Sequence, residues 1–165
     1  MASRSVMKSI FLCAVMLCFV AAARAQTASD WLTPHNTARE ALNVGELDLV
    51  WDSALEFYAT NWAQHQATSD NCNVTISAGP FGENIHWDNS ATLPSDAVQS
   101  WVNQQQWYNY ATNACAAGEI CLDYTQIVWK TTVALGCGQV SCPGGGTFAV
   151  CSYYPPGNVV GQSPY

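Results

Sequence analysis

Apolar residues recur at helical intervals in three segments, and the first runs from about residue 30 to residue 43. Thr33 and Pro34 fit an N-cap followed by a first-turn proline, because proline suits the start of a helix and lacks an amide donor. Gly45 follows the segment, where glycine commonly ends a helix. The pattern predicts a helix whose apolar stripe must pack on another element.

Two further segments have the same helical pattern. The second begins after Asp52, and Ser53 and Glu56 have the spacing of a capping box. The third starts near Ser95, directly after Pro94. The recurring positions are Leu55, Tyr58, Ala59, Trp62 and Ala63 in the second segment, and Val98, Trp101, Val102 and Gln105 in the third.

The C-terminal part of the chain has the pattern of a β-hairpin. Residues 135–142 and 147–154 are β-type segments, and the turn-rich sequence Pro143-Gly144-Gly145-Gly146 joins them. Residues 155–165 are rich in Pro and Gly, which excludes a helix and predicts an extended or looped tail. The hairpin is therefore the expected support for the three helices.

The first 25 residues have the pattern of a secretory signal peptide. A basic start (Arg4, Lys8) precedes an apolar run over 10–20 and a small-residue cleavage site, Ala23-Arg24-Ala25. The apolar run is too short for about 30 Å of hydrocarbon at about 1.5 Å per residue, which disfavours a membrane anchor. We expect a cleaved leader over 1–25, one mature domain over 26–165, export to the extracellular space and no stable membrane insertion.

Charge narrows the possible partners. Among the 165 residues, the mature segment keeps only Arg39 and Lys130 as cations against twelve acidic residues, a formal charge of −10. Nucleic acids and anionic membrane surfaces require basic side chains that neutralise phosphate. The sequence therefore predicts no nucleic-acid partner, and 49% hydrophobic residues in so short a chain predict a single core.

Six cysteines remain after the leader is removed, an even number that predicts three disulfides in an oxidising compartment. Spacing alone leaves fifteen connectivities. Zinc is the weaker alternative, because no two cysteines are separated by two residues and no histidine follows Cys121. Asn73-Val74-Thr75 is an N-glycosylation acceptor, which would place its loop on the surface.

The usual catalytic motifs are missing from the sequence. It has no G-x-S-x-G or H-E-x-x-H, and paired cysteines leave no thiol nucleophile. Each of His35, His65 and His86 could be a ligand or a base, and we favour a structural or partly exposed imidazole for all three.

Two other groups of residues could line a site. Glu83 and Asn84 directly follow the glycine-containing segment Gly79-Pro80-Phe81-Gly82, where such side chains bond the neighbouring backbone or line a pocket, and we favour the structural role. Trp107-Tyr108-Asn109-Tyr110 follows the third predicted helix, and aromatic side chains in a loop suit an apolar ligand.

Four motifs follow one another along the chain. They are His35-Asn36-Thr37-Ala38-Arg39, Gly82-Glu83-Asn84, Tyr124-Thr125-Gln126-Ile127-Val128-Trp129 and Cys151-Ser152-Tyr153-Tyr154-Pro155-Pro156-Gly157-Asn158. Their order and spacing resemble the CAP superfamily, and among its branches the plant pathogenesis-related class one proteins, including the ending Gly161-Gln162-Ser163-Pro164-Tyr165. The resemblance implies an α+β fold, a three-layer α/β/α sandwich with a central antiparallel sheet, and the disulfides Cys72–Cys142, Cys115–Cys121 and Cys137–Cys151.

The resemblance also implies a cleft with two His and two Glu that would bind a divalent metal. At the four corresponding positions this chain has Ile76, Glu83, Gln104 and Asp123. Only Glu83 is retained, and a zinc site needs three or four N, O or S donors. We therefore expect no metal or other cofactor, although Glu83 and Asp123 could hold a hard cation weakly.

Two family features of the C-terminal half match in part. In some members a loop with the order aromatic, any, aromatic, four others, aromatic binds sterol; here Tyr108 and Tyr110 fit, next to Trp107, and Cys115 holds the third place. Plant members can release their last eleven residues after a Cys-Asn-Tyr-Asp sequence. This chain has Tyr154 before Pro155, so we expect a strand-end junction that a protease can reach but recognises poorly.

Together with the signal and charge patterns, the resemblance implies a monomeric, non-enzymatic plant defence protein of the extracellular space, the apoplast. Its expected partners are a sterol or another lipid, with the tail as a second route of action. The alternatives are a metal-dependent hydrolase, which the lost ligands disfavour, and a disulfide-stapled scaffold bound by a protein partner such as a pathogen effector or receptor.

Overall fold

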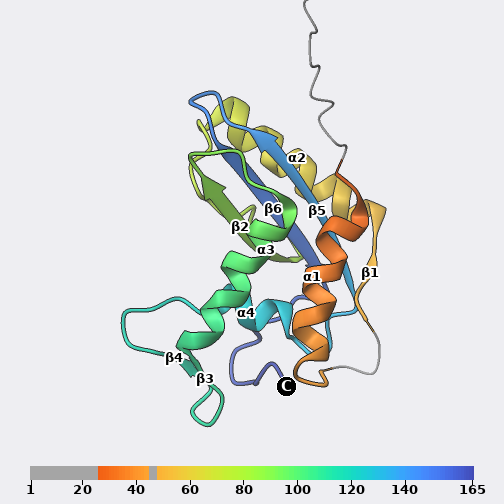
Figure 1. Cartoon of the computed structure of the whole chain (residues 1–165), viewed down its shortest axis with the longest axis vertical. Helices are drawn as coiled ribbons and strands as arrows, with labels where there is room; N and C mark the ends of the chain where they lie inside the picture. Colours follow the sequence, from red (N-terminus) through yellow and green to blue (C-terminus); the bar gives the residue numbers. More distant parts are fainter. Residues whose placement is uncertain (1–25, 45–47) are drawn as a thin grey trace, which may run out of the picture.

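A four-stranded sheet separates two layers of helices (Figure 1). The computed structural model describes residues 26–44 and 48–165. The predicted leader over 1–25 and the predicted helix-ending Gly45 lie outside the described residues. The α/β/α arrangement implied by the resemblance is present.

The sheet has the strand order β1-β5-β6-β2. β5 (Ala134–Ser141) and β6 (Thr147–Tyr154) form the predicted hairpin, and β2 (Gly82–Asp88) lies antiparallel to β6. The central sheet is antiparallel as expected, with one short edge strand, β1 (Val50–Trp51), that pairs in parallel with β5. The amides of Val50 and Asp52 donate to carbonyls of Val133 and Leu135, which fixes this two-residue edge strand.

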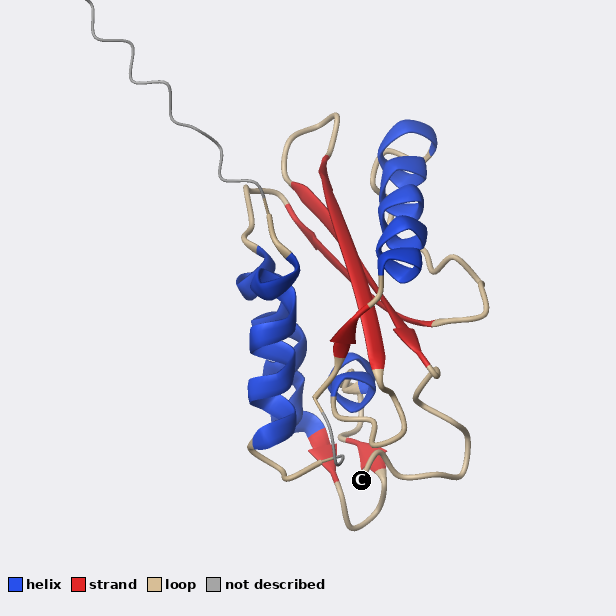
Figure 2. Cartoon of the chain, turned by 90° about the vertical axis from the view of Figure 1, so that its right-hand side faces the viewer, coloured by secondary structure: helices blue, strands red, loops and turns tan. Residues whose placement is uncertain are grey.

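Helices cover both faces of the sheet (Figure 2). α2 (Ser53–Ser69) packs on β5 and β6 from one side. α1 (Ala28–Glu40), α3 (Pro94–Val102) and the short α4 (Leu122–Ile127) lie on the other side. After α3 the chain continues through the 3-10 helix η1 (Asn103–Trp107) into a small ribbon of β3 (Tyr108–Asn109) and β4 (Ala114–Cys115).

α1 begins earlier than the sequence pattern indicated. Its N-cap is Thr27, whose backbone amide donates to the Asp30 carboxylate over 2.8 Å. Pro34 therefore lies inside the helix, and its predicted first-turn position is wrong. α3 has the feature expected for α1, since Pro94 is its first residue.

The predicted capping box of α2 is also wrong. Asp52 is the N-cap, and its Oδ1 accepts from the amides of Ala54 and Leu55 at 2.7 and 3.1 Å. Glu56 instead accepts from the indole N–H of Trp51 over 2.9 Å. An Asp directly before the helix can reach these amides, which leaves Ser53 as an ordinary first-turn residue.

Glycines let α2 approach β5 closely. A Cβ at Gly136 would collide with the backbone of Asp52 and Glu56, and one at Gly138 would collide with Thr60. On this side of the sheet Ala59 and Ala63 are fully buried with Phe148 and Val150. Small residues on both elements thus bring the helix onto the strands.

Three disulfides fasten the fold. They are Cys72–Cys142, Cys115–Cys121 and Cys137–Cys151, the pairs that the resemblance implies. Residues 155–165 form no helix or strand. Within the described ranges, no helix has the length and apolar character needed to cross a membrane.

Candidate functional site

His35 is a buried structural residue. Its Nδ1 donates to the carbonyl of Trp31 over 2.8 Å, so its Nε2 accepts from the Tyr153 hydroxyl, also at 2.8 Å. Burial lowers the pKa of His35 to about 4. The neutral imidazole therefore joins α1 to β6 near neutral pH, and the structural role expected for His35 fits this geometry.

Arg39 is the second buried residue of the α1 motif. Its guanidinium donates to the carbonyls of Ile127, Trp129 and Thr132 at 3.0, 2.8 and 3.2 Å. This leaves Lys130 as the exposed Lys or Arg within 26–44 and 48–165. The described surface thus offers very little positive charge to an anionic ligand.

The cleft positions that could hold a metal do not come together as a ligand set. Ile76 is 67% exposed and has no donor atom. Glu83 uses Oε1 to accept from the Ser77 amide over 2.8 Å, while its Oε2 is buried without a hydrogen-bond partner. Burial raises the pKa of Glu83, and the hydrogen bonds from Ser77 oppose this rise. Glu83 of β2 thus bonds the backbone of the segment that precedes its strand.

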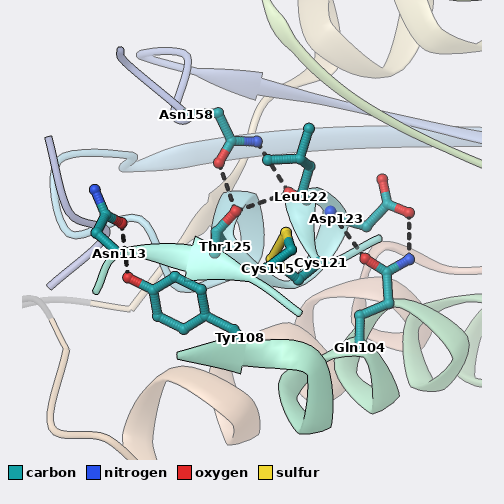
Figure 3. Close-up of a disulfide and its surroundings, with 9 residues drawn as sticks. All are labelled: Gln104, Tyr108, Asn113, Cys115, Cys121, Leu122, Asp123, Thr125 and Asn158. Atoms are coloured by element: carbon teal, nitrogen blue, oxygen red, sulfur yellow. Dashed lines mark hydrogen bonds between the residues drawn. A yellow bond between two sulfur atoms is a disulfide. The ribbon is translucent and has the colours of Figure 1, made fainter. Parts of the chain in front are cut away.

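The other two cleft positions bind each other (Figure 3). The Gln104 amide donates to Oδ2 of Asp123 over 2.6 Å, and the Asp123 backbone amide donates to Gln104 Oε1 over 3.1 Å. Burial raises the pKa of Asp123 to about 6, and the bond from Gln104 opposes this rise. The pair joins η1 to the first turn of α4.

These residues do not fit the family's metal. In the part of the chain that the structure describes, no three His, Cys, Asp or Glu side chains are grouped as metal ligands. Ile76 provides no donor, and both polar ends of the Gln104 side chain are engaged by Asp123. A zinc ion would need at least three ready donors in tight geometry.

The neighbouring polar residues of β2 also have local partners. Asn84 donates from Nδ2 to the carbonyl of Asp123 over 3.0 Å. His86 Nδ1 lies 3.0 Å from the Ser100 hydroxyl, and burial lowers the pKa of this histidine. The third histidine, His65, lies on α2, where it is exposed and stacks on Trp62 with ring centroids 5.0 Å apart. The sequence pattern did not indicate Ser77 and Ser100 as partners.

The aromatic loop contacts the C-terminal residue. Tyr110 stacks on Tyr165 with centroids 4.9 Å apart and an interplanar angle of 9°, and Tyr108 meets Tyr165 edge-on at 6.4 Å. Tyr108 packs against the main core, and its hydroxyl donates to Asn113 over 2.9 Å (Figure 3). Tyr108 is therefore partly a core residue, whereas Trp107 is 36% exposed.

The predicted cleavage junction is held at the end of the sheet. β6 ends at Tyr154, whose carbonyl accepts from the Val133 amide over 2.9 Å and whose ring packs edge-on against Phe81 at 6.4 Å. The carbonyl of Pro155 accepts from the Thr132 hydroxyl over 2.9 Å. The predicted strand end is present and the carbonyls on both sides of the Tyr154–Pro155 bond are hydrogen-bonded, while access and recognition by a protease stay predictions. Asn73, the predicted glycosylation position, is exposed.

An open groove of about 680 Å³ runs between α1 and α3. Pro34, Ala38 and Ala41 form one wall at helical spacing, Val102 lies opposite, and Tyr124 reaches the groove from α4. The other lining residues are Ser29, Asp30, Thr33, Thr37, Leu42, Ser95, Gln99 and Gln105. Local sequence patterns did not indicate this groove, because the small residues at positions i, i+4 and i+7 give one wall and the opposite wall comes from a helix far away in the chain.

Comparison with known proteins identifies the family. The model of CAP, the cysteine-rich secretory protein family, matches residues 32–153. The chain belongs to the CAP family. It is 41% identical over 166 residues to pathogenesis-related protein 1C of Nicotiana tabacum, covering 98% of this chain and 96% of that protein. It is 45% identical over 139 residues to pathogenesis-related protein PRMS of Zea mays, covering 82% and 81%.

Solved CAP structures share the fold of this CAP protein. Venom allergen-like protein 4 of Schistosoma mansoni superposes with a TM-score of 0.65 at 22% identity, covering 85% of this chain and 95% of that one. NaASP2, solved with Zn2+, superposes with a TM-score of 0.63 at 22% identity, covering 83% of each chain. The zinc ion belongs to that structure.

Proposed function

We propose that this pathogenesis-related CAP protein is secreted to the extracellular space and binds a neutral lipid, such as a sterol, without catalysing a reaction. The observation that carries the proposal is the groove between α1 and α3. Its volume of about 680 Å³ lies within the range of pockets for small molecules, and Pro34, Ala38, Leu42 and Val102 give it an apolar wall.

The polar residues of the groove favour a neutral head group. Ser29, Thr33, Thr37 and Ser95 offer hydroxyls, and Gln99 and Gln105 offer amides. The described lining contains Asp30 and no Lys, Arg or His. A carboxylate such as that of a fatty acid would meet an acidic residue and no cation, whereas an alcohol can donate to or accept from these groups. The lining therefore suits a sterol better than a fatty acid.

Two observations support binding in place of hydrolysis. The four cleft positions provide no metal-ligand set, as described above. The described cysteines of the mature domain are all paired, which removes the thiol nucleophile. The tail is also fastened to the body, which favours a ligand-binding role over ready release of a peptide.

Binding of a fluorescent sterol to two variants, each with one residue replaced by tryptophan, tests the site. Thr37→Trp places a large ring on the exposed wall of the groove, and Gln64→Trp places the same ring on the exposed face of α2. We expect Thr37→Trp to weaken binding of dehydroergosterol at least ~10-fold and Gln64→Trp to leave it unchanged. Equal binding by both variants would place the ligand elsewhere, and Tyr110→Ala then tests the aromatic loop.

A further inference from the structure

The C-terminal tail is fixed to the body at two separate places. The first anchor lies at 155–158, where the Gly157 amide donates to Gln126 Oε1 over 2.8 Å and Asn158 accepts from the Thr125 hydroxyl over 2.6 Å. The second anchor lies at 162–165. The turn between them is exposed, and Val160 is 98% exposed.

The second anchor is a set of contacts to the last residues of the chain. The Lys130 amide donates to the carbonyl of Pro164 over 2.7 Å, and Asn113 Nδ2 donates to the carbonyl of Gln162 over 2.8 Å. Pro164 is buried even though it is the penultimate residue. The body thus binds the tail backbone at two carbonyls, those of Gln162 and Pro164.

The terminal Tyr165 is held on three aromatic residues. Its ring stacks on Tyr110 and meets Tyr108 edge-on, and its hydroxyl lies 3.5 Å from that of Tyr124. Three side chains of the body thus contact one aromatic ring of the tail. We call these three residues, Tyr108, Tyr110 and Tyr124, the tyrosine seat. Stacked and edge-on contacts of this kind select an aromatic side chain.

Tyr108 and Tyr124 of the tyrosine seat are held in place without the tail. β3 pairs with β4, and Cys115 of β4 is bonded to Cys121 at the start of α4 (Figure 3). Tyr108 is fixed by its hydrogen bond to Asn113. A cavity of about 210 Å³ remains between this surface and the tail, lined in part by Leu122 and Trp129. A surface organised in advance loses little entropy when a peptide binds.

We propose that the surface under residues 162–165 is a binding site for the peptide sequence Gln-Ser-Pro-Tyr, and that residues 162–165 of the chain itself occupy it. The exposed turn at 159–161 allows residues 162–165 to detach from the body while residues 155–158 stay bound. A second peptide of the same sequence then binds in trans, through the Lys130 amide, Asn113 and the tyrosine seat. The site shares Tyr124 with the groove between α1 and α3 but is otherwise separate from it, and the inference does not depend on lipid binding.

Anisotropy of a labelled peptide tests the proposal on the whole chain. The probe is Val-Val-Gly-Gln-Ser-Pro-Tyr with fluorescein on its N-terminus. A tethered tail competes at high effective concentration, so Tyr165→Ala should bind the probe at least ~10-fold more tightly than the parent protein. The same probe with Ala in place of Tyr should not bind. Val160→Ala, which changes the exposed turn alone, should behave like the parent.

Hydrogen exchange of the Lys130 amide gives a second readout. Tyr165→Ala should exchange this amide faster, and the probe should restore its protection. Equal probe affinity for the parent and Tyr165→Ala would overturn the proposal, and so would failure of Tyr165→Ala to bind the probe. If Tyr165→Ala does not fold, Pro164→Gly loosens the same anchor and the same outcomes apply.

Discussion

Gln104 and Asp123 hold each other through two hydrogen bonds, one from the Gln104 amide to the Asp123 carboxylate and one from the Asp123 backbone amide to Gln104 Oε1. The pair connects η1 to the start of α4 and uses both polar ends of the glutamine. Two positions that correspond to metal-ligand positions of the CAP family are therefore engaged in holding η1 and α4 together.

The first prediction is that the protein does not bind zinc stoichiometrically. Calorimetric titration near neutral pH should give no one-to-one isotherm, because Ile76 and Gln104 supply no free donor. The triple variant Ile76→His, Gln104→Glu and Asp123→His restores the family pattern and should bind. A tight isotherm from the parent protein that is abolished by Glu83→Ala would contradict this.

The second prediction concerns acid stability, where His35 and Asp123 have opposite effects. His35 has a pKa of about 4 in the fold against 6.5 ordinarily, so the unfolded chain binds its proton first and stability falls between pH 6.5 and 4. Asp123 has a pKa of about 6 against 3.8, so the fold binds its proton first and stability rises from pH 6 to 3.8. The two effects offset each other near pH 5.

Asp123→Asn tests this balance. At pH 7 the variant should be more stable than the parent, by up to about 3 kcal/mol for a shift of roughly two pKa units, because it buries no charge. This advantage should shrink to nearly nothing by pH 4, where the parent is protonated. Urea unfolding at pH 7, 5 and 4 measures it, and an advantage that stays constant with pH would show that Asp123 is not the responsible group.

The third prediction is that Arg39 is a major contributor to stability. Arg39→Met leaves the carbonyls of Ile127 and Thr132 without this donor, while the Trp129 carbonyl keeps the Thr132 amide, and unpaired buried acceptors cost about 1–3 kcal/mol each. We expect a loss on the order of 4 kcal/mol in denaturant unfolding. Lys130→Met is the matched control, because it removes the same charge from an exposed position; an equal loss in both variants would contradict the account.

Much of the fold could be predicted from the sequence, because the three helices and the C-terminal hairpin have strong local periodicity. Pro34 was misplaced because the N-cap at Thr27 lies before the apolar stripe begins. The groove and the seat of Tyr165 could not be predicted by local patterns. The groove joins helices far apart in sequence, and Tyr165 meets Tyr110 only after the whole chain has folded.

The fourth prediction concerns release of residues 155–165. The parent protein should release this peptide poorly in plant extracellular fluid, because its junction has Tyr154 and the carbonyls on both sides of it are bonded. Tyr154→Asp should increase release at least ~10-fold, which corresponds to roughly 1.4 kcal/mol in transition-state binding.

Thr132→Ala separates access from recognition at the same junction. It removes the hydrogen bond to the Pro155 carbonyl and leaves Tyr154 in place. Peptide mass spectrometry after equal incubation compares the three proteins. More release from Thr132→Ala would show that local opening limits the cut, whereas equal release from the parent and Tyr154→Asp would show that residue 154 does not control it.

The most direct test of the central claim is mass spectrometry of the lipids that copurify with the protein secreted by plant cells. The account predicts a neutral lipid, such as a sterol, near one molecule per chain in the parent and in Gln64→Trp, and its loss in Thr37→Trp. Fatty acids as the main bound species, or the same neutral lipid retained by Thr37→Trp, would contradict binding in the groove between α1 and α3.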